Sequence, residues 1–584
     1  MLSYRKLAMR VLGRPLHTGG NDSPRPASQR AAAFVLTAAM LTTLAAPAFA
    51  GTWHIENGDI TISAGESGND VTQNNVTTKN DTNTIITNEN KDIASSHTVT
   101  IDAGNDKVEV TLEDVNIKAD SGSALISNGD VTLTLKGDNS LTGGISGNGS
   151  GRNGIASSGS LTISGGEKDS LTAQGGNGGD GIYGGDGITS SGSLTISGGT
   201  VTATGGDSTG SVGSGGSGIY SVSGDVTISG GTVNANGGDG KNGSGGGDGI
   251  CSSGGVTISG GSTVTANGGN GGSIGGGSGI YSNGSVTISG GTVTANGGNS
   301  TNSSGGYGIR SLDVAISSGT VTANGGDSKD GYGGDGIHSN GVTISGGTVN
   351  TTGGNGNGGN GGGNGIIGSG RVAISGGTVK AAGGNGNGGN GIINNGIISN
   401  DIDLSGSLEL TAKAGSPNGK ALSRAGHELN LDDIKEKLDP GAKVTAINAN
   451  GDSKQVSIPR PVEPEKPVIP EESSSSSGGG SAAPSAPASP LPGLTVTDKS
   501  GAVISYTSTQ SGNTLTVCVG RLTASLHVSL AALRQLRAEG IETITFQTVL
   551  CSTSLSVDEL LAMGGEDAEA VLTHRLTDSS LTVG

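Results

Sequence analysis

A sequence unit of about thirty residues recurs along the middle of the chain and sets the strongest limit on its fold. One copy reads GIYSNGSVTISGGTVTANGG at 279–298, and related copies occupy 187–206, 218–238 and 336–354. The isoleucine of each TIS or AIS triplet marks the period, at Ile163, Ile196, Ile228, Ile258, Ile288, Ile316, Ile344 and Ile374. Successive isoleucines lie 28 to 33 residues apart. A unit this short cannot bury an apolar face alone, so the period predicts a stacked solenoid.

Within each copy, apolar residues alternate with small polar residues in three short runs of the form GIxS, VTIS and TVTA. This alternation is typical of strands with one buried face, and the Ser-Gly, Asn-Gly and Gly-Gly pairs between the runs predict turns. Stacked copies would pair each strand with its equivalent in the next coil. We therefore predict an all-β chain, a right-handed parallel β-helix (solenoid) of about ten coils, plus a small C-terminal α/β module.

Glycine content fits this fold because it is periodic. The chain holds 116 glycines among 584 residues and only 2% aromatic residues, a composition that would otherwise indicate disorder. In the repeat, glycine marks the turns while isoleucine and valine fill the interior. We expect flexible-linker behaviour only in the long glycine-rich loops.

The N-terminal region predicts export. An apolar run follows Arg25 and Arg30 and ends in Ala48-Phe49-Ala50, which matches an A-x-A cleavage site, so residues 1–50 are expected to be a signal peptide. No later run of eighteen apolar residues occurs, so we expect no membrane span after signal removal. The predicted localisation is extracellular, either secreted or associated with the cell surface.

The rest of the chain divides by composition. Residues 51–145 are expected to form the N-terminal cap and first coil, 146–415 the β-helix repeats, and 416–456 a C-terminal cap that includes a short helix. Residues 457–493 form a Pro/Ser/Gly linker. Residues 494–584 have the mixed strand and helix pattern of a small α/β module, which we expect to contact a surface partner.

Net charge restricts the class of partner. The chain carries a charge of −18, and from Gly51 onward 26 Lys and Arg face 49 Asp and Glu, a charge of −23. A strongly acidic protein repels nucleic acid, so nucleic-acid binding is excluded. Binding of an acidic glycan would require calcium bridges or a local basic patch.

The variable residue of GIxS points outward and carries the most varied side chains. Along the copies it is Ala156, Thr189, Tyr220, Cys251, Tyr281, Arg310, His338 and Ile367. Sugars are bound by aromatic faces together with hydrogen-bonding side chains, so Tyr220, Tyr281, Arg310 and His338 are candidates for carbohydrate binding. The alternative is ordinary strand decoration, because tyrosine favours strands.

A second candidate group lies in the sixth to eighth copies, where outward Ser, Thr and Asn give way to charged residues. Its members are Arg310, Asp313, Asp335, His338, Arg371 and Lys380. Arginine binds carboxylates through two parallel hydrogen bonds, so Arg371 joins the carbohydrate-binding candidates and a uronic acid is one expected ligand. The alternative is solvated surface.

Loop aspartates raise the question of calcium. Asp180, Asp186, Asp248 and Asp335 follow glycines directly, a spacing that departs from the calcium-binding repeat GGxGxDxUx. Several of them precede GI, where other copies carry Asn153, Ser217, Ser278 and Asn364. These four aspartates are therefore candidate calcium ligands, with a turn-capping ladder of Asx and Ser side chains as the alternative.

Three cysteines occur in the chain. Cys518 and Cys551 each end a predicted strand of the C-terminal module and could form one disulfide in an exported protein. Cys251 lies alone in the repeats, where we interpret it as a small residue without a chemical role.

Two other function classes have some support. Rows of T-x-T at 200–202, 263–265, 292–294 and 320–322 resemble ice-binding solenoids, although Asn234, Asn350 and Lys380 interrupt them. A polysaccharide lyase or glycosidase would require clustered carboxylates on the strands. Only Asp313 and Asp335 lie near Arg310 and His338, so we predict that the chain is not an enzyme.

The segment VEVTLEDVNIKADSGSALISNGDVTLTLKGDNSLTGG at 108–144, followed by SLTISGG coils, resembles a known family. It is similar to secreted bacterial carbohydrate-binding β-helix proteins related to the clostridial polygalacturonate-binding domain. The segment GTWHIENGDITIS after the predicted signal is also similar. The resemblance covers 51–415 and implies a right-handed β-helix, glycan binding and calcium. No motif of that family maps binding residues onto this chain.

Together, these features predict a secreted or cell-surface, non-catalytic polysaccharide-binding protein. The alternative is a structural or adhesin-type surface rod that displays its C-terminal module. Neither the glycan nor the role of 494–584 follows from the sequence.

Overall fold

A computed structural model describes residues 50–584, except 180–181, 211, 242, 358–359, 388–393, 461–492, 499–500, 505, 512, 520, 522, 549–551, 564–568, 575–578 and 584. The predicted signal peptide up to residue 49 and most of the predicted linker thus lie outside the described residues. The chain divides into two compact units, 1–464 and 465–584.

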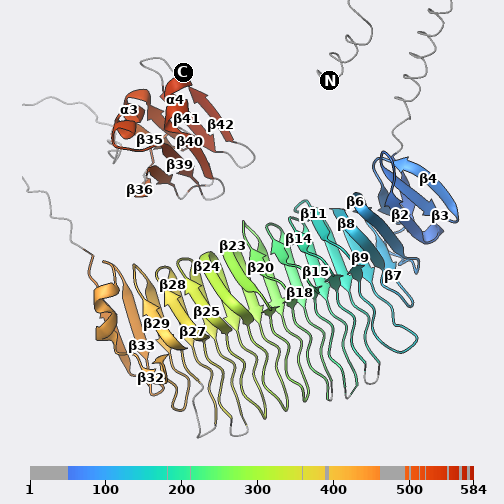
Figure 1. Cartoon of the computed structure of the whole chain (residues 1–584), viewed down its shortest axis with the longest axis horizontal. Helices are drawn as coiled ribbons and strands as arrows, with labels where there is room; N and C mark the ends of the chain where they lie inside the picture. The colour runs from blue at the N-terminus through green and yellow to red at the C-terminus, as the bar shows by residue number, and fades with distance from the viewer. Residues whose placement is uncertain are drawn as a thin grey trace, which may run out of the picture. The chain divides into compact units, whose positions relative to one another are not determined.

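The first unit is a parallel β-helix, as predicted from the repeats (Figure 1). One coil consists of β16 (Ile219–Ser221), β17 (Val226–Ile228) and β18 (Thr232–Asn236). These strands pair in parallel with β19 (Ile250–Ser252), β20 (Val256–Ile258) and β21 (Thr263–Asn267) of the next coil. Each strand meets its sequence equivalent, so chemically identical positions form columns along the solenoid.

The remaining strands of the repeat region continue these columns. They are β10 (Ile155–Ser157), β11 (Leu161–Gly165), β12 (Ser170–Gln174), β13 (Ile188–Ser190), β14 (Leu194–Ile196), β15 (Thr200–Thr204), β22 (Ile280–Ser282), β23 (Ser285–Asn296), β24 (Ile309–Asn324), β25 (Ile337–Ile344), β26 (Thr348–Thr352), β27 (Ile366–Ile374), β28 (Thr378–Ala382), β29 (Ile397–Leu404) and β30 (Glu409–Lys413).

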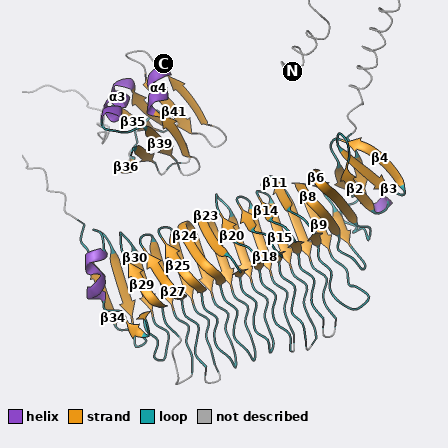
Figure 2. Ribbon diagram, viewed as in Figure 1, coloured by secondary structure: helices purple, strands orange, loops and turns teal. Residues whose placement is uncertain are grey.

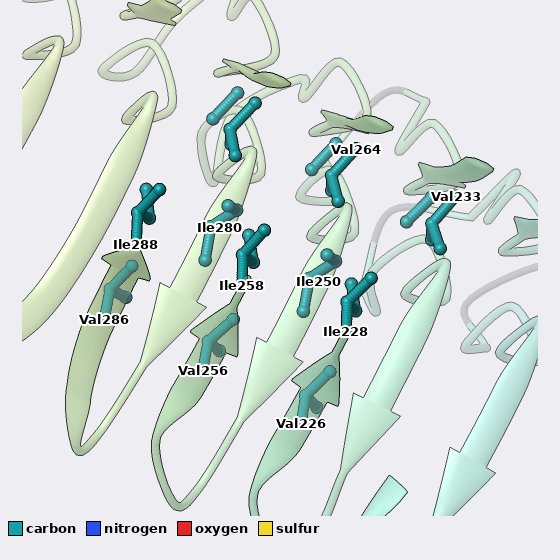
Figure 3. Packing of buried hydrophobic residues seen from close by; sticks show 14 of the residues in the cluster. Val226, Ile228, Val233, Ile250, Val256, Ile258, Val264, Ile280, Val286 and Ile288 are labelled. Atoms are coloured by element: carbon teal, nitrogen blue, oxygen red, sulfur yellow. The ribbon is translucent and has the colours of Figure 1, made fainter. Parts of the chain in front are cut away.

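Stacked isoleucine and valine side chains form the interior (Figure 3). Ile228, Ile258 and Ile288 lie one above the other with no exposed surface, and the valines two residues earlier form an adjacent column. Each fully buried aliphatic side chain contributes about 1.5–3 kcal/mol. The thin core therefore stabilises the fold through many identical small contributions.

The described parts of the glycine-rich loops are hydrogen-bonded between coils, which corrects for these parts the expectation of flexible-linker behaviour. They stack along one side of the solenoid (Figure 2) and are joined by backbone hydrogen bonds. Gly216 N donates to Gly206 O at 2.9 Å, and Gly206 N donates to Gly185 O of the preceding coil at 2.7 Å. A Cβ atom on Gly216 would lie 1.9 Å from Gly185 O, so only glycine allows this approach.

A second stabilising feature, which the sequence analysis did not predict, is a row of Asn and Asp side chains at the start of these loops. One Asn or Asp per coil accepts the backbone N–H of the equivalent residue in the next coil, at 2.6 to 3.0 Å. The members are Asn177, Asp207, Asp239, Asn270, Asn299, Asp327, Asn355 and Asn385.

The solenoid has about 15 turns rather than about ten. Coils without the TISGG signature extend it into both predicted caps, since apolar alternation alone is enough to build a coil. At the N-terminal end these elements are β1 (Thr52–His54), η1 (Ile55–Asn57), β2 (Ile60–Ala64), β3 (Asn69–Gln73), β4 (Val76–Asp81), β5 (Ile85–Thr87), β6 (Val99–Glu113), β7 (Asn116–Lys118), β8 (Leu125–Lys136) and β9 (Asp138–Thr142). At the C-terminal end they are β31 (Leu422–Arg424), β32 (His427–Glu428), η2 (Leu431–Lys437), β33 (Lys443–Ile447) and β34 (Ser453–Ser457).

The predicted capping helix is present as the 3₁₀ helix η2, whose N-cap Asn430 accepts Asp432 N–H. At the opposite end, the antiparallel strands β2, β3 and β4 cover the first coil.

The second unit combines two four-stranded sheets with two helices. One sheet contains β35 (Leu494–Thr497), β38 (Ala524–Ser529), β41 (Glu569–His574) and β42 (Ser579–Val583); the other contains β36 (Thr507–Ser511), β37 (Thr514–Cys518), β39 (Thr543–Gln547) and β40 (Ser552–Ser556). The helices are α3 (Leu530–Ala538) and α4 (Val557–Met563). Ser529 caps α3, and Gly540 follows the end of the helix with φ +88°. Among the described residues, no helix is long and apolar enough to cross a bilayer.

Candidate functional site

The predicted outward stripe is a continuous column. The variable GIxS residues pair in register from Ala156 through Thr189, Tyr220, Cys251, Tyr281, Arg310 and His338 to Ile367. Adjacent members belong to adjacent coils, which lie ~4.8 Å apart. Three consecutive coils thus place Tyr281, Arg310 and His338 side by side.

Arg310 is held by two aromatic rings. Its guanidinium carbon lies 5.4 Å from the ring centroid of Tyr281 and 5.3 Å from that of Tyr307. Each contact is within cation–π range. Arg310 is exposed, and no ion pair to it is found among the described residues. The rings therefore fix a cation whose N–H groups can still donate to an incoming oxygen.

His338 is oriented by a buried carboxylate. Its Nδ1 lies 2.8 Å from Asp335 Oδ2, and its ring packs against Tyr307 at a centroid distance of 4.7 Å. Asp335 is only 6% exposed and also accepts the backbone N–H of Asn364 at 2.7 Å. The contact with Asp335 fixes the orientation of the ring, and Nε2 remains as the second polar atom of the ring.

A shallow groove of about 290 Å³ lies over these coils. It is lined by Tyr281, Ser282, Asn283, Arg310, Ser311, Leu312, His338, Ser339, Asn340 and Ser369. Leu312 is 54% exposed and gives the groove an apolar contact. Hydroxyl, amide, guanidinium and imidazole groups provide the polar contacts, and the lining contains no carboxylate.

Tyr307 is a candidate site residue that sequence reasoning missed. It precedes GI, the position that other coils fill with Asn, Asp or Ser, and it is half-buried between Arg310 and His338. Burial raises the pKa of Tyr307, Asp335 acts in the same direction, and Arg310 opposes the shift. A tyrosine at a position that the other copies fill with Asn, Asp or Ser could have been recognised in the sequence.

The second predicted cluster does not assemble as a unit. Arg371 belongs to a different column, where its guanidinium nitrogen lies 2.6 Å from Asp403 Oδ2. Asp403 also pairs with Lys437 at 3.1 Å, and hydrogen bonding to Lys437 and Arg371 lowers the pKa of Asp403. Lys380 lies on β28, between Asn350 and Thr411. Arg371 and Lys380 are thus outside the groove, because the register assigns them to other columns.

Tyr220 is also outside the groove. Cys251 separates it from Tyr281 along the column. Burial raises the pKa of the Cys251 thiol, and the neighbouring Asp248 and Asp186 act in the same direction. A thiol that stays protonated is a poor nucleophile, in agreement with its interpretation as a residue without a chemical role.

The aspartates that precede GI form the turn-capping ladder given as the alternative to calcium. Oδ1 of Asp186 accepts Ser217 N–H at 2.6 Å, and Oδ1 of Asp248 accepts Ser278 N–H at 2.6 Å. Asp335 caps Asn364 in the same way. Asp180, the fourth candidate, lies outside the described residues.

These carboxylates do not converge on one ion. Asp186 and Asp248 are two coils apart, or ~10 Å, which exceeds the span of a shared calcium shell. No group of three or more His, Cys, Asp or Glu that could hold a metal is found within the described chain. Calcium binding remains a prediction.

Burial shifts the titration of two ladder carboxyls. It raises the pKa of Asp186, while hydrogen bonds from Thr189 and Ser217 oppose the change. For Asp248 burial raises the pKa to about 6, against hydrogen bonds from Ser278 and Cys251 and attraction to Arg310. Asp248 therefore titrates near neutral pH directly beneath the stripe.

Only one cysteine of the predicted disulfide, Cys518, belongs to the part of the chain that the structure describes. The Cys518 sulfur lies 3.5 Å from Gln547 Oε1. Cys551 lies outside the described residues, so the pairing stays a prediction.

No protein-family model, curated protein or solved structure matches this chain. The resemblance to the polygalacturonate-binding family thus rests on the sequence motifs given above.

Proposed function

We propose that the chain is a non-catalytic polysaccharide-binding protein, exported or held at the cell surface, whose sugar site is the groove over Tyr281, Arg310 and His338. The observation that carries the proposal is the exposed Arg310, which contacts the rings of Tyr281 and Tyr307 and forms no ion pair among the described residues.

The groove chemistry fits a sugar chain. Tyr281 and Leu312 offer apolar surface for the C–H face of a pyranose ring, whereas Asn283, Asn340 and His338 offer groups for its hydroxyls. The N–H groups of Arg310 can bind a hydroxyl or a uronic acid carboxylate. The open end-to-end course of the column suits a polymer rather than a small molecule.

The absence of carboxylates from the lining supports a non-catalytic role. Glycoside hydrolysis uses two carboxyl groups that flank the bond to be cleaved. Asp335, which contacts the lining residue His338, lies outside the lining, and its carboxylate is buried and engaged by His338 and Asn364.

The test is retention of the purified protein on a panel of neutral and uronic acid polysaccharides, in calcium and in EDTA, with new reducing and unsaturated ends assayed in the same samples. Retention without product ends is expected. Arg310→Gln should weaken it at least tenfold, whereas Lys380→Gln, which removes an exposed cation outside the groove, should not change it.

Loss of retention in EDTA would add calcium to the proposal. Retention that Arg310→Gln and Tyr281→Ala leave unchanged would refute the groove as the site. Failure on every glycan would favour the surface-rod alternative, with the function in 494–584.

A further inference from the structure

A buried carboxylate in the N-terminal cap lacks a cation. Asp81, at the end of β4, is only 1% exposed. Its Oδ1 accepts the backbone N–H groups of Gly51 at 2.9 Å and Asn83 at 3.1 Å, and its Oδ2 accepts Trp53 Nε1–H at 2.9 Å. All three donors are neutral, and no Lys, Arg or His pairs with Asp81 within the described residues. Buried charges in proteins are normally paired.

Gly51 is the first buried residue of the described chain. It is buried, and its carbonyl accepts Ile85 N–H at 2.9 Å, whereas Ala50 is exposed. Ala50 is also the last residue of the A-x-A pattern at 48–50. The expected scissile bond therefore joins an exposed residue to the nitrogen that already contacts Asp81.

We propose that cleavage of the Ala50–Gly51 bond creates a functional N-terminus, in which the α-ammonium group of Gly51 forms a buried ion pair with Asp81. A leader-removing peptidase adds water across the amide, which leaves a carboxylate on Ala50 and an amine on Gly51. The amine takes up a proton and becomes an ammonium group. The nitrogen keeps its place 2.9 Å from Oδ1, but it changes from a neutral single donor into a charged triple donor.

The consequence is a cap that is completed by processing. The ion pair joins β1, which carries Trp53, to the end of β4, so it fastens the antiparallel strands that cover the first coil. This inference rests on the cleavage pattern and on the cap geometry, and it is independent of sugar binding.

The experiment compares two full-length mature chains, one that begins at Gly51 and one that begins at Ala50. The second carries its α-amine one residue outside the fold and keeps Gly51 N as an amide. Asp81→Asn is made in both chains, and Asp59→Asn, which removes a carboxylate that is 69% exposed in the same cap, is the control for charge. Trp53 is the single tryptophan, so its fluorescence reports unfolding of the cap.

Asp81→Asn is expected to lower the cap's unfolding midpoint by several degrees more in the Gly51 chain than in the Ala50 chain, and Asp59→Asn to affect both equally. An amine-reactive reagent should label Gly51 at least tenfold more slowly than Ala50, as expected for a rise of about one pKa unit or more. If Asp81→Asn does not fold, labelling of the two unsubstituted chains decides the question.

Three results would overturn the proposal. They are an equal loss on Asp81→Asn in both chains, equally fast labelling of the two amines, and an exported protein whose first residue is not Gly51.

Discussion

Replacement of Asp248 by Asn is expected to stabilise the solenoid at pH 8 and to leave it unchanged near pH 4. Burial raises the pKa of Asp248 from 3.8 to about 6 in the folded chain. The folded state therefore holds its proton more tightly than the unfolded state. Ionisation of Asp248 disfavours folding, and this cost appears as the pH rises through the window from about 4 to 6.

The magnitude follows from the size of the shift. About two pKa units correspond to about 3 kcal/mol of lost stability once the pH is well above 6. Asn keeps the structural role, because Asn364 occupies the same ladder and its Oδ1 accepts Asn395 N–H at 2.9 Å. The shift to about 6 already includes the attraction between Asp248 and Arg310, so we expect a gain of up to about 3 kcal/mol at pH 8.

The assay is urea unfolding at pH 4.5 and pH 8. Because repeat arrays open locally, amide exchange at Ser278, which Asp248 caps, should also slow at pH 8 in the variant. Asp225→Asn is the control, since Asp225 is exposed and caps Gly255 N–H in a comparable way. A variant that is less stable than the parent at pH 8, or equally shifted at both pH values, would refute the assignment.

Three other predictions concern the loops, the core and the groove. Gly216→Ala should destabilise the solenoid by about 2–4 kcal/mol in chemical unfolding, because its Cβ would meet Gly185 O; Gly261→Ala, with no atom within 4 Å, should cost less than about 1 kcal/mol. Ile258→Ala should cost about 2–5 kcal/mol, measured in the same way, since the side chain is fully buried. Tyr307→Asn should preserve the melting temperature but weaken glycan retention, because it restores the ladder residue and removes one ring from Arg310; unchanged retention would contradict the groove proposal.

The repeat made the coils predictable because burial acts identically in each of them. A VTI triplet buries Val and Ile in every coil, so a two-residue alternation and a constant period are enough to place strands and core. Coils such as that of β6 were harder to count, since they share the alternation but not the turn residues that mark the period.

Sequence reasoning failed where the outcome depends on neighbours in adjacent coils. Glycine is compatible with both a flexible chain and close packing. In these loops, carbonyl groups of the adjacent coil approach so closely that only glycine fits, as at Gly206. Arg371 looked available because Asp403, its partner, lies 32 residues away and only the register brings the two together. A charge on a solenoid surface is thus interpretable only after the coils are aligned.

Alignment of the coils also identifies residues that differ from those at the same position in the other copies and do not take part in the capping ladder. The position before GI holds Asn, Asp or Ser in other coils, and the Asn and Asp side chains cap the next coil through Oδ1. Tyr307 replaces such a residue, and no bond of this ladder passes through it within the described chain. Three residues later in the same coil, Arg310 replaces the small or aromatic residue that other copies carry, and it lies over the Tyr307 ring. Together the two residues present an oriented cation at the surface. Arg310 lines the groove and Tyr307 contacts it from beside the groove, so both departures from the repeat support the proposed sugar site.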